Sequence, residues 1–327
     1  MATMARAGGY NNLAKGNWAP AIYSQKVLKY FRRASVVEAI TNTDYSGEIE
    51  NFGDTVNIIK EPTITVASYG RGTTVNTQEL TDDQIQMTVD QGNYFAFKVD
   101  DIEERQSHVN WEALSTSAGA YALKKNYDYN VLKAIADNAA TDSNLGTAGS
   151  AVSINVVNEA LNMLSTAQQI LDENDVPEEN RWCVAPPQFW TQIRLAKTDA
   201  AGAPAILDAS ATGNQSAMMN GRITDRKIHG FDLYQSNTMV VGSAGTAAAA
   251  TFGPSSTSGE MYVLFGHMSA VATASNIAKT EVIRDPDSFA DIVRGLHVFG
   301  RKVLRGSGSG YKGVFAGVAD FNSKLEE

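Results

Sequence analysis

The feature that most constrains the fold is an alternation of apolar and polar residues on both sides of a turn-rich stretch from Tyr69 to Thr74. The alternating apolar residues are Val56, Ile58, Ile64 and Val66 before that stretch, and Ile85, Met87, Val89, Phe95, Phe97 and Val99 after it. A period of two is typical of extended strands. Pro62 interrupts the first segment, and because proline cannot donate to a central ladder, that strand is predicted to be irregular or at an edge. The pattern predicts one long β-hairpin with an irregular tip.

Such a hairpin cannot be an independent unit, because two strands alone are marginally stable in water. It must lie either on the body of its own chain or on a neighbouring copy. A contact between copies is therefore one of two explanations that the sequence leaves open.

A long helix is predicted directly after the hairpin. From about Val109 to Ala139, apolar residues recur at spacings of three and four, and Gly119 is the only glycine or proline in the stretch. About 30 residues at about 1.5 Å each make a rod of about 45 Å.

Residues 151–305 have the pattern of a mixed helix and strand unit. The apolar run from Arg181 to Ala185 is typical of a buried strand, and Pro186-Pro187 then opens a predicted helix. Further strands are predicted at Met261–Phe265, Ala278–Ile283 and Leu296–Leu304. The run from Gly306 to Gly310 is a linker-type sequence, so the residues after it are predicted to form a tail.

Charge argues against a protein that grips nucleic acid over most of its surface. The 327 residues carry 27 Lys and Arg against 36 Asp and Glu, a net charge of −9, whereas phosphate binding depends on cationic side chains. The first 37 residues are the exception, since they contain basic residues and no acidic one: Arg6, Lys15, Lys26, Lys29, Arg32 and Arg33. This contrast indicates either an ordinary solvated surface or a basic arm that meets an acidic partner or another copy.

No catalytic, cofactor-binding or metal-binding residues are predicted, and the chain is not expected to be an enzyme. The four histidines, His108, His229, His267 and His297, do not stand at metal-ligand spacing. The acidic pairs at 82–83, 100–101 and 103–104 are interpreted as a solvated face, and the single Cys183 as a buried thiol. No apolar run is long enough to span a membrane.

The order of these parts resembles the major capsid protein of tailed bacteriophages, an α+β protein with the Hong Kong 97-type capsid fold. The resemblance is carried by six segments: Gly53 to Ile58, Asn93 to Val99, Val109 to Ala139, Arg181 to Trp190, Asn220 to Asn237, and Phe289 to Val303. It implies an N-terminal arm at 1–45, an extended hairpin called the E-loop at 46–100, and an axial domain at 146–277. It also implies a peripheral domain, made of 101–145 with a long spine helix and of 278–327 with the C-terminal tail.

The function implied by the resemblance is that of a shell subunit. Pentamers and hexamers of the chain would form the icosahedral head of a tailed phage around its double-stranded DNA, without sequence specificity. The implied partners are further copies of the chain and the portal protein. A separate scaffolding protein is also expected, because the sequence is not expected to have a long removable segment before the arm. A decoration protein is left open as a further partner. Assembly in the host bacterial cytoplasm and a final location in the virion capsid are expected.

Three alternatives remain at the level of sequence. An encapsulin-like shell around a cargo enzyme resembles the same fold. A hydrolase with a site assembled from His229, His267 or His297 would have one deep pocket. A virion decoration protein would be smaller and would not need so long a hairpin.

Overall fold

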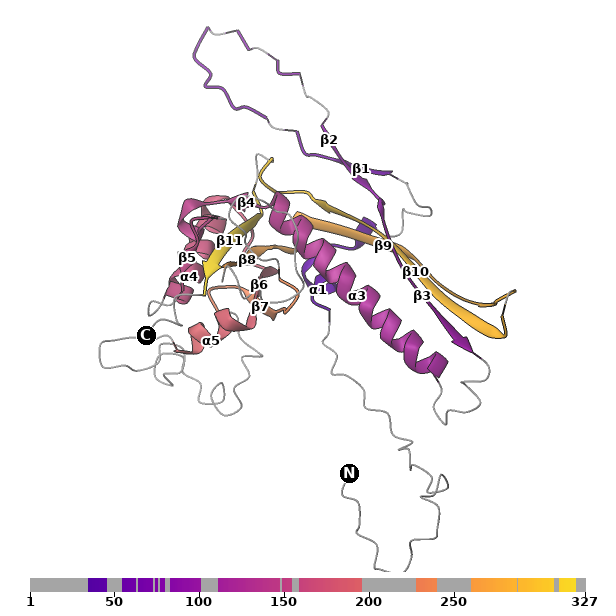
Figure 1. The fold of residues 1–327 in the computed structure, drawn as a ribbon. Helices are drawn as coiled ribbons and strands as arrows, with labels where there is room; N and C mark the ends of the chain where they lie inside the picture. The colour runs from indigo at the N-terminus through magenta and orange to yellow at the C-terminus, as the bar shows by residue number, and fades with distance from the viewer. Residues whose placement is uncertain are drawn as a thin grey trace, which may run out of the picture.

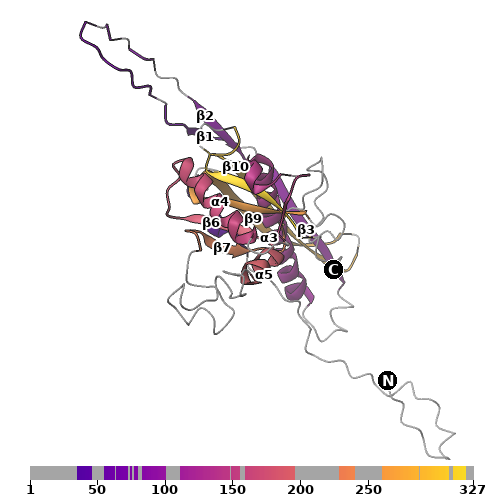
Figure 2. The same cartoon turned by 90° about the vertical axis from the view of Figure 1, so that its left-hand side faces the viewer.

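The structure is a computed structural model, and it describes residues 35–45, 55–62, 64–72, 74–75, 77–79, 83–100, 111–147, 149–154, 159–195, 228–239, 260–286, 288–308 and 312–321. Helices and sheets are both present, as the sequence predicts. A body with a mixed sheet continues into a long helix that lies beside three long strands, and a loop projects away from both (Figures 1 and 2).

The body is built on a six-stranded sheet with the order β4-β11-β8-β6-β7, in which β5 also pairs with β11. Its strands are β4 (Ala140–Thr141), β5 (Val152–Ser153), β6 (Arg181–Ala185), β7 (Asp232–Gln235), β8 (Glu260–His267) and β11 (Val314–Asp320). The buried strand predicted at 181–185 is confirmed as β6, in which all five residues are buried.

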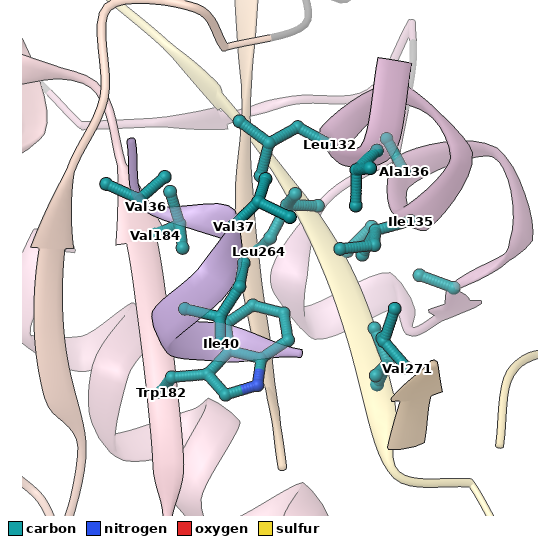
Figure 3. Close-up of a cluster of buried hydrophobic side chains, with 14 of the residues drawn as sticks. Val36, Val37, Ile40, Leu132, Ile135, Ala136, Trp182, Val184, Leu264 and Val271 are labelled. Carbon is teal, nitrogen blue, oxygen red and sulfur yellow. The ribbon is translucent and has the colours of Figure 1, made fainter. Parts of the chain in front are cut away.

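Strand β6 is buried because both faces of the sheet are covered. Cys183 and Ala185 face α4 (Glu159–Glu173) and α5 (Pro187–Leu195), whereas Trp182 and Val184 belong to the opposite core. That second core is closed by α1 (Val37–Ile40) and by the C-terminal half of α3 (Trp111–Asn138), as Figure 3 shows. The short 3-10 helix η2 (Ser143–Leu145) lies between β4 and β5 in the chain, and η4 (Met268–Ala270) follows β8 directly.

Helix α3 agrees with the helix predicted from about Val109 to Ala139. It lies over an antiparallel three-stranded sheet of order β3-β10-β9, formed by β3 (Gln91–Asp100), β9 (Val271–Arg284) and β10 (Ala290–Val303) (Figure 1). The close approach of α3 depends on two glycines. A Cβ atom at Gly119 would lie 2.9 Å from the Phe95 ring, and one at Gly295 would lie 2.4 Å from it. The ring of Phe95 therefore fits between helix and sheet because neither glycine has a side chain.

The predicted single long hairpin is wrong in its pairing. Strand β1 (Thr55–Ile59) pairs with β2 (Gln84–Thr88), but β3 pairs with β10 instead of returning beside β1. The first strand also ends before Pro62, at Ile59. The hairpin proper is thus five residue pairs long, and its base is held to the body by contacts of Val56, Met87 and Val89 with Ala272, Ala274 and Val298.

The prediction of a tail after Gly306 is also wrong for residues 314–320. These residues form β11, which lies between β4 and β8 and is almost entirely buried. The run Val314 to Ala319 is apolar throughout, and burial on both faces of a sheet is what such a run favours. Residues 314–320 therefore belong to the core of the body.

Candidate assembly surfaces

The loop that joins β1 to β2 projects away from the body in both views (Figures 1 and 2). It contains no strand among its described residues between Lys60 and Asp83. Its apolar side chains are nevertheless large and exposed: Ile64 is 68% exposed, Val66 93%, Tyr69 72% and Val75 73%. Clustered exposed apolar side chains on a soluble chain mark a surface that another molecule covers. We call residues 60–83 the projecting loop.

The base of the projecting loop is closed by an ion pair. Lys60 Nζ lies 2.6 Å from Asp83 Oδ2, and the Lys60 N–H donates to the Asp83 carbonyl at 2.8 Å. The hydrogen bond and charge of Lys60 hold the pKa of Asp83 below its usual range. Farther out, the Thr65 N–H donates to the side-chain oxygen of Gln78 at 3.0 Å rather than to a backbone carbonyl. Beyond the base, this side-chain contact rather than a backbone ladder joins the described parts of the two limbs.

The second region relevant to assembly is the place where the N-terminal segment enters the core. Val37 and Ile40 of α1 are fully buried among Leu132, Ile135 and Trp182 (Figure 3). Thr41 Oγ1 lies 2.8 Å from Thr273 Oγ1. The predicted arm at 1–45 thus ends in the core, while the basic residues at 6–33 lie outside the described residues.

Asp128 of α3 holds the start of α1. Asp128 is 6% exposed, and its carboxylate accepts hydrogen bonds from Ser35 Oγ and from the backbone N–H groups of Val36 and Val37. Burial raises the pKa of Asp128, and these hydrogen bonds oppose the rise. Glu38 and Lys124, 3.2 Å apart, form an ion pair between the same two helices.

The raised pKa of Asp128 predicts a pH-dependent contribution to stability. A group whose folded-state pKa is raised contributes stability below its unfolded pKa, and that contribution is lost as pH rises through the folded pKa. We therefore expect the unfolding free energy of the unassembled wild-type subunit to fall, relative to Asp128→Asn, as pH rises from acid toward neutral. Urea unfolding of both proteins across this range measures the difference. A difference that stays constant with pH would contradict the assignment.

The three described histidines lie in different elements of the fold. His229 lies in a turn before β7, His267 ends β8, and His297 lies in the middle of β10. Burial lowers the pKa of both His267 and His297, which favours their neutral forms. His297 packs against Tyr127 and Phe299. His108 lies outside the described residues.

Cys183 and the acidic pairs are the other candidate groups of the sequence. Cys183 is fully buried, and burial raises the pKa of its thiol well above the usual value, so the reactive thiolate is disfavoured. Of the acidic pairs, Asp82, Asp101, Glu103 and Glu104 lie outside the described residues. Within the described part of the chain, no group of three or more His, Cys, Asp or Glu residues could hold a metal ion. No described helix is both long and apolar enough to cross a membrane.

A comparison with protein-family models matches residues 59–315 to the family described as phage capsid protein. The chain belongs to the phage capsid protein family. The matched residues cover the projecting loop, α3, the three-stranded sheet and the six-stranded sheet except for most of β11. No curated protein sequence matches the chain significantly.

Solved structures of phage capsids share the fold over nearly the whole chain. A structure from Mycobacterium phage Che8 has a TM-score of 0.71 and 25% identity, and the alignment covers 93% of this chain and 98% of that one. The capsid of the cyanophage P-SCSP1u gives a TM-score of 0.64 at 17% identity, covering 97% and 99%. The mature capsid of bacteriophage PhiM1 gives 0.62 at 14%, covering 98% and 99%. These matches support a structural protein of the virion capsid and do not favour the encapsulin-like alternative.

Proposed function

We propose that this phage capsid protein assembles as pentamers and hexamers into an icosahedral head around the double-stranded DNA of a tailed phage. The observation that carries the proposal is the projecting loop, whose exposed Ile64, Val66, Tyr69 and Val75 find no cover within the described part of the chain. Burying one such side chain stabilises a contact by about 1.5–3 kcal/mol. In a closed shell, a neighbouring copy would cover these side chains, and the same contact would recur between many pairs of copies.

The detailed fold assignment is part of the same proposal. In Hong Kong 97-type terms, the projecting loop with β1 and β2 would be the E-loop and α3 the spine helix. The predicted division would place α3 and the three-stranded sheet in the peripheral domain and most of the six-stranded sheet in the axial domain. Strand β11 would join the axial sheet, because it pairs with β8.

The partners are proposed from the resemblance and from charge. The basic segment at 1–37 would meet a scaffolding protein or DNA on the inner side of the shell, while the net charge of −9 keeps the rest of the surface acidic. The portal protein and a decoration protein would be further partners. Assembly would take place in the host bacterial cytoplasm, and the chain itself would have no catalytic site.

Particle formation is the direct test. The chain is co-expressed with its neighbouring genes and analysed by size exclusion with light scattering and by negative-stain microscopy. Closed particles of megadalton mass, containing nuclease-protected DNA when packaging genes are present, are expected. A monomer or dimer under these conditions would contradict the shell function, and particles that enclose a protein cargo without DNA would return the encapsulin-like alternative.

A further inference from the structure

A cavity of about 240 Å³ lies between α3 and the three-stranded sheet. Its walls are mainly apolar, and its lining includes Phe95 of β3, Leu123 and Tyr127 of α3, and Thr280 of β9. Helix α3 rests on β10 and β3 (Figure 1), and the cavity extends from the side of this helix toward β9. An apolar cavity of roughly 150 Å³ is enough to hold benzene. This cavity is therefore large enough for one aromatic ring with a small substituent.

Two polar side chains beneath α3 have buried atoms without a partner. They are Asn93 of β3 and His297 of β10, and within the described part of the chain neither Asn93 Nδ2 nor His297 Nδ1 has a hydrogen-bond partner. His297 lines the cavity, and Asn93 lines a neighbouring cavity that shares Phe95 and Leu123 with it. Because native proteins rarely leave buried polar atoms unpaired, these two atoms require an explanation.

The two side chains are neighbours in space. Asn93 stands directly opposite His297 in the antiparallel pairing of β3 with β10. Side chains in this relation lie on one face of the sheet, with Cβ atoms about 4.5–5.5 Å apart. The face is the one under α3, because the His297 ring packs edge-on against the Tyr127 ring, with 5.4 Å between centroids. A single oxygen atom between Asn93 and His297 can therefore reach both.

The chemistry of the pair indicates which group is missing. Asn93 Nδ2 is a donor and needs an acceptor. Burial lowers the pKa of His297, which favours the neutral imidazole, and in a neutral ring Nδ1 is a donor or an acceptor according to the tautomer. A hydroxyl group can accept from Asn93 and can either donate to His297 or accept from it. A hydroxyl therefore complements the pair in both tautomers.

The charged side chains at the rim of the cavity are already paired. Lys124 Nζ lies 3.2 Å from Glu38 Oε1, and both residues line the cavity. Lys279, which also lines it, places its Nζ 2.5 Å from Glu281 Oε1. A charged ligand would have to compete with one of these ion pairs. The rim thus favours a ligand without charge.

We propose that the cavity binds a small neutral aromatic alcohol, whose ring lies against Phe95 and Leu123 and whose hydroxyl bridges Asn93 Nδ2 and His297 Nδ1. Burial of the ring provides the affinity, and the hydroxyl provides specificity, because a site with unpaired polar groups rejects an analogue that cannot pair them. A bound ligand would connect α3 to β3 and β10 and so stabilise the folded chain. The inference does not depend on the shell function, because every group in the site comes from one chain.

Phenol and toluene are the probes, because they have the same number of non-hydrogen atoms and differ in the hydroxyl. Isothermal titration calorimetry of the purified full-length chain measures the binding of each. Phenol is expected to bind with a dissociation constant of about 1 mM or below. Toluene is expected to bind at least about tenfold more weakly, because it leaves both buried polar atoms unpaired.

Two substitutions remove the polar atoms and keep similar shapes: Asn93→Leu and His297→Phe. Replacing an unpaired buried polar group by an apolar group of the same shape is nearly neutral for stability, so both variants are expected to fold. Each is expected to weaken phenol binding at least about tenfold and to leave toluene binding within about twofold of the wild type. Asn57→Leu, at an exposed position in β1, is the matched control and is expected to bind phenol as the wild type does.

Nitrogen NMR supplies a readout that does not depend on affinity. The signal of His297 Nδ1 is expected to shift when phenol is added and to stay unchanged with toluene, because only phenol forms a hydrogen bond there. Phenol that does not bind, that binds no more tightly than toluene, or that binds both variants as it binds the wild type would overturn the inference. The two polar atoms would then be paired by water only. Particle formation tests the shell function separately, so failure of one does not count against the other.

Discussion

Gly306→Ala is expected to lower the unfolding free energy of the subunit by about 3 kcal/mol, the upper part of the range for overpacking a tight site. Gly306 is buried where the chain passes the end of α3, and a Cβ atom there would lie 2.2 Å from the Asn138 backbone oxygen. The adjacent Ser307 N–H donates to that same oxygen at 3.0 Å. The overlapping atom is therefore part of the helix end and cannot rotate away as a side chain would.

Gly308→Ala is the matched control for this change. It stands two residues along the same segment, is exposed, and has nothing within 4 Å of its Cβ position. Both substitutions restrict the unfolded chain equally, an effect of about 0.4–1 kcal/mol in favour of the folded state. Urea unfolding of the unassembled subunit compares them. Equal midpoints for the two variants would show that the contact between Gly306 and α3 does not hold the C-terminal segment in place.

The sequence predicts the elements of this fold better than their partners. The helix at 111–138 and the strand at 181–185 follow from local patterns, because periodicity reports which side of an element is buried. Alternation at Phe95, Phe97 and Val99 likewise identifies the less exposed side of β3 but contains nothing about which strand pairs with it. Its partner β10 begins 190 positions later in the chain, at Ala290, so proximity in sequence favours the wrong neighbour.

Two further differences between the sequence-based prediction and the structure have local causes. The glycine-rich run from Gly306 has the composition of a linker, yet Gly306 serves close packing, and the apolar run from Val314 to Ala319 was the signal for β11 that the tail prediction overlooked. Arg181 opens the predicted apolar strand as a charged residue, and the structure buries it at 1% exposure. It can be buried because its Nη1 lies 2.7 Å from Asp172 Oδ1, while its Nε donates to the Pro177 carbonyl and its Nη2 to the Val176 carbonyl.

The assembly surface follows from the sequence only in part. Alternation at Ile64 and Val66 predicts a strand, and the marginal stability of an isolated hairpin predicts that something must cover it. The pattern does not show that these side chains remain exposed in the folded subunit. An apolar strand can be covered by its own body or by another copy, and the sequence pattern is the same in both cases. The exposed fractions in the folded chain favour the second explanation.

Replacing the four exposed apolar residues of the projecting loop is expected to abolish particle formation while leaving the subunit folded. The variant is Ile64→Thr, Val66→Thr, Tyr69→Ser and Val75→Thr. Because these side chains are already exposed in the subunit, the unfolding free energy should change by less than about 0.5 kcal/mol for each. In a shell, each substitution would remove up to about 1.5–3 kcal/mol of stabilising apolar burial at every contact between copies.

The matched control changes polar neighbours in the same loop: Thr65→Ser, Ser68→Thr, Thr74→Ser and Thr77→Ser. Light scattering after size exclusion should find megadalton particles for the control and unassembled subunits for the apolar variant. Particles of normal size and yield from the apolar variant would mean that the exposed side chains of the loop contribute nothing to assembly, and the contacts between copies would then have to lie on the body of the subunit.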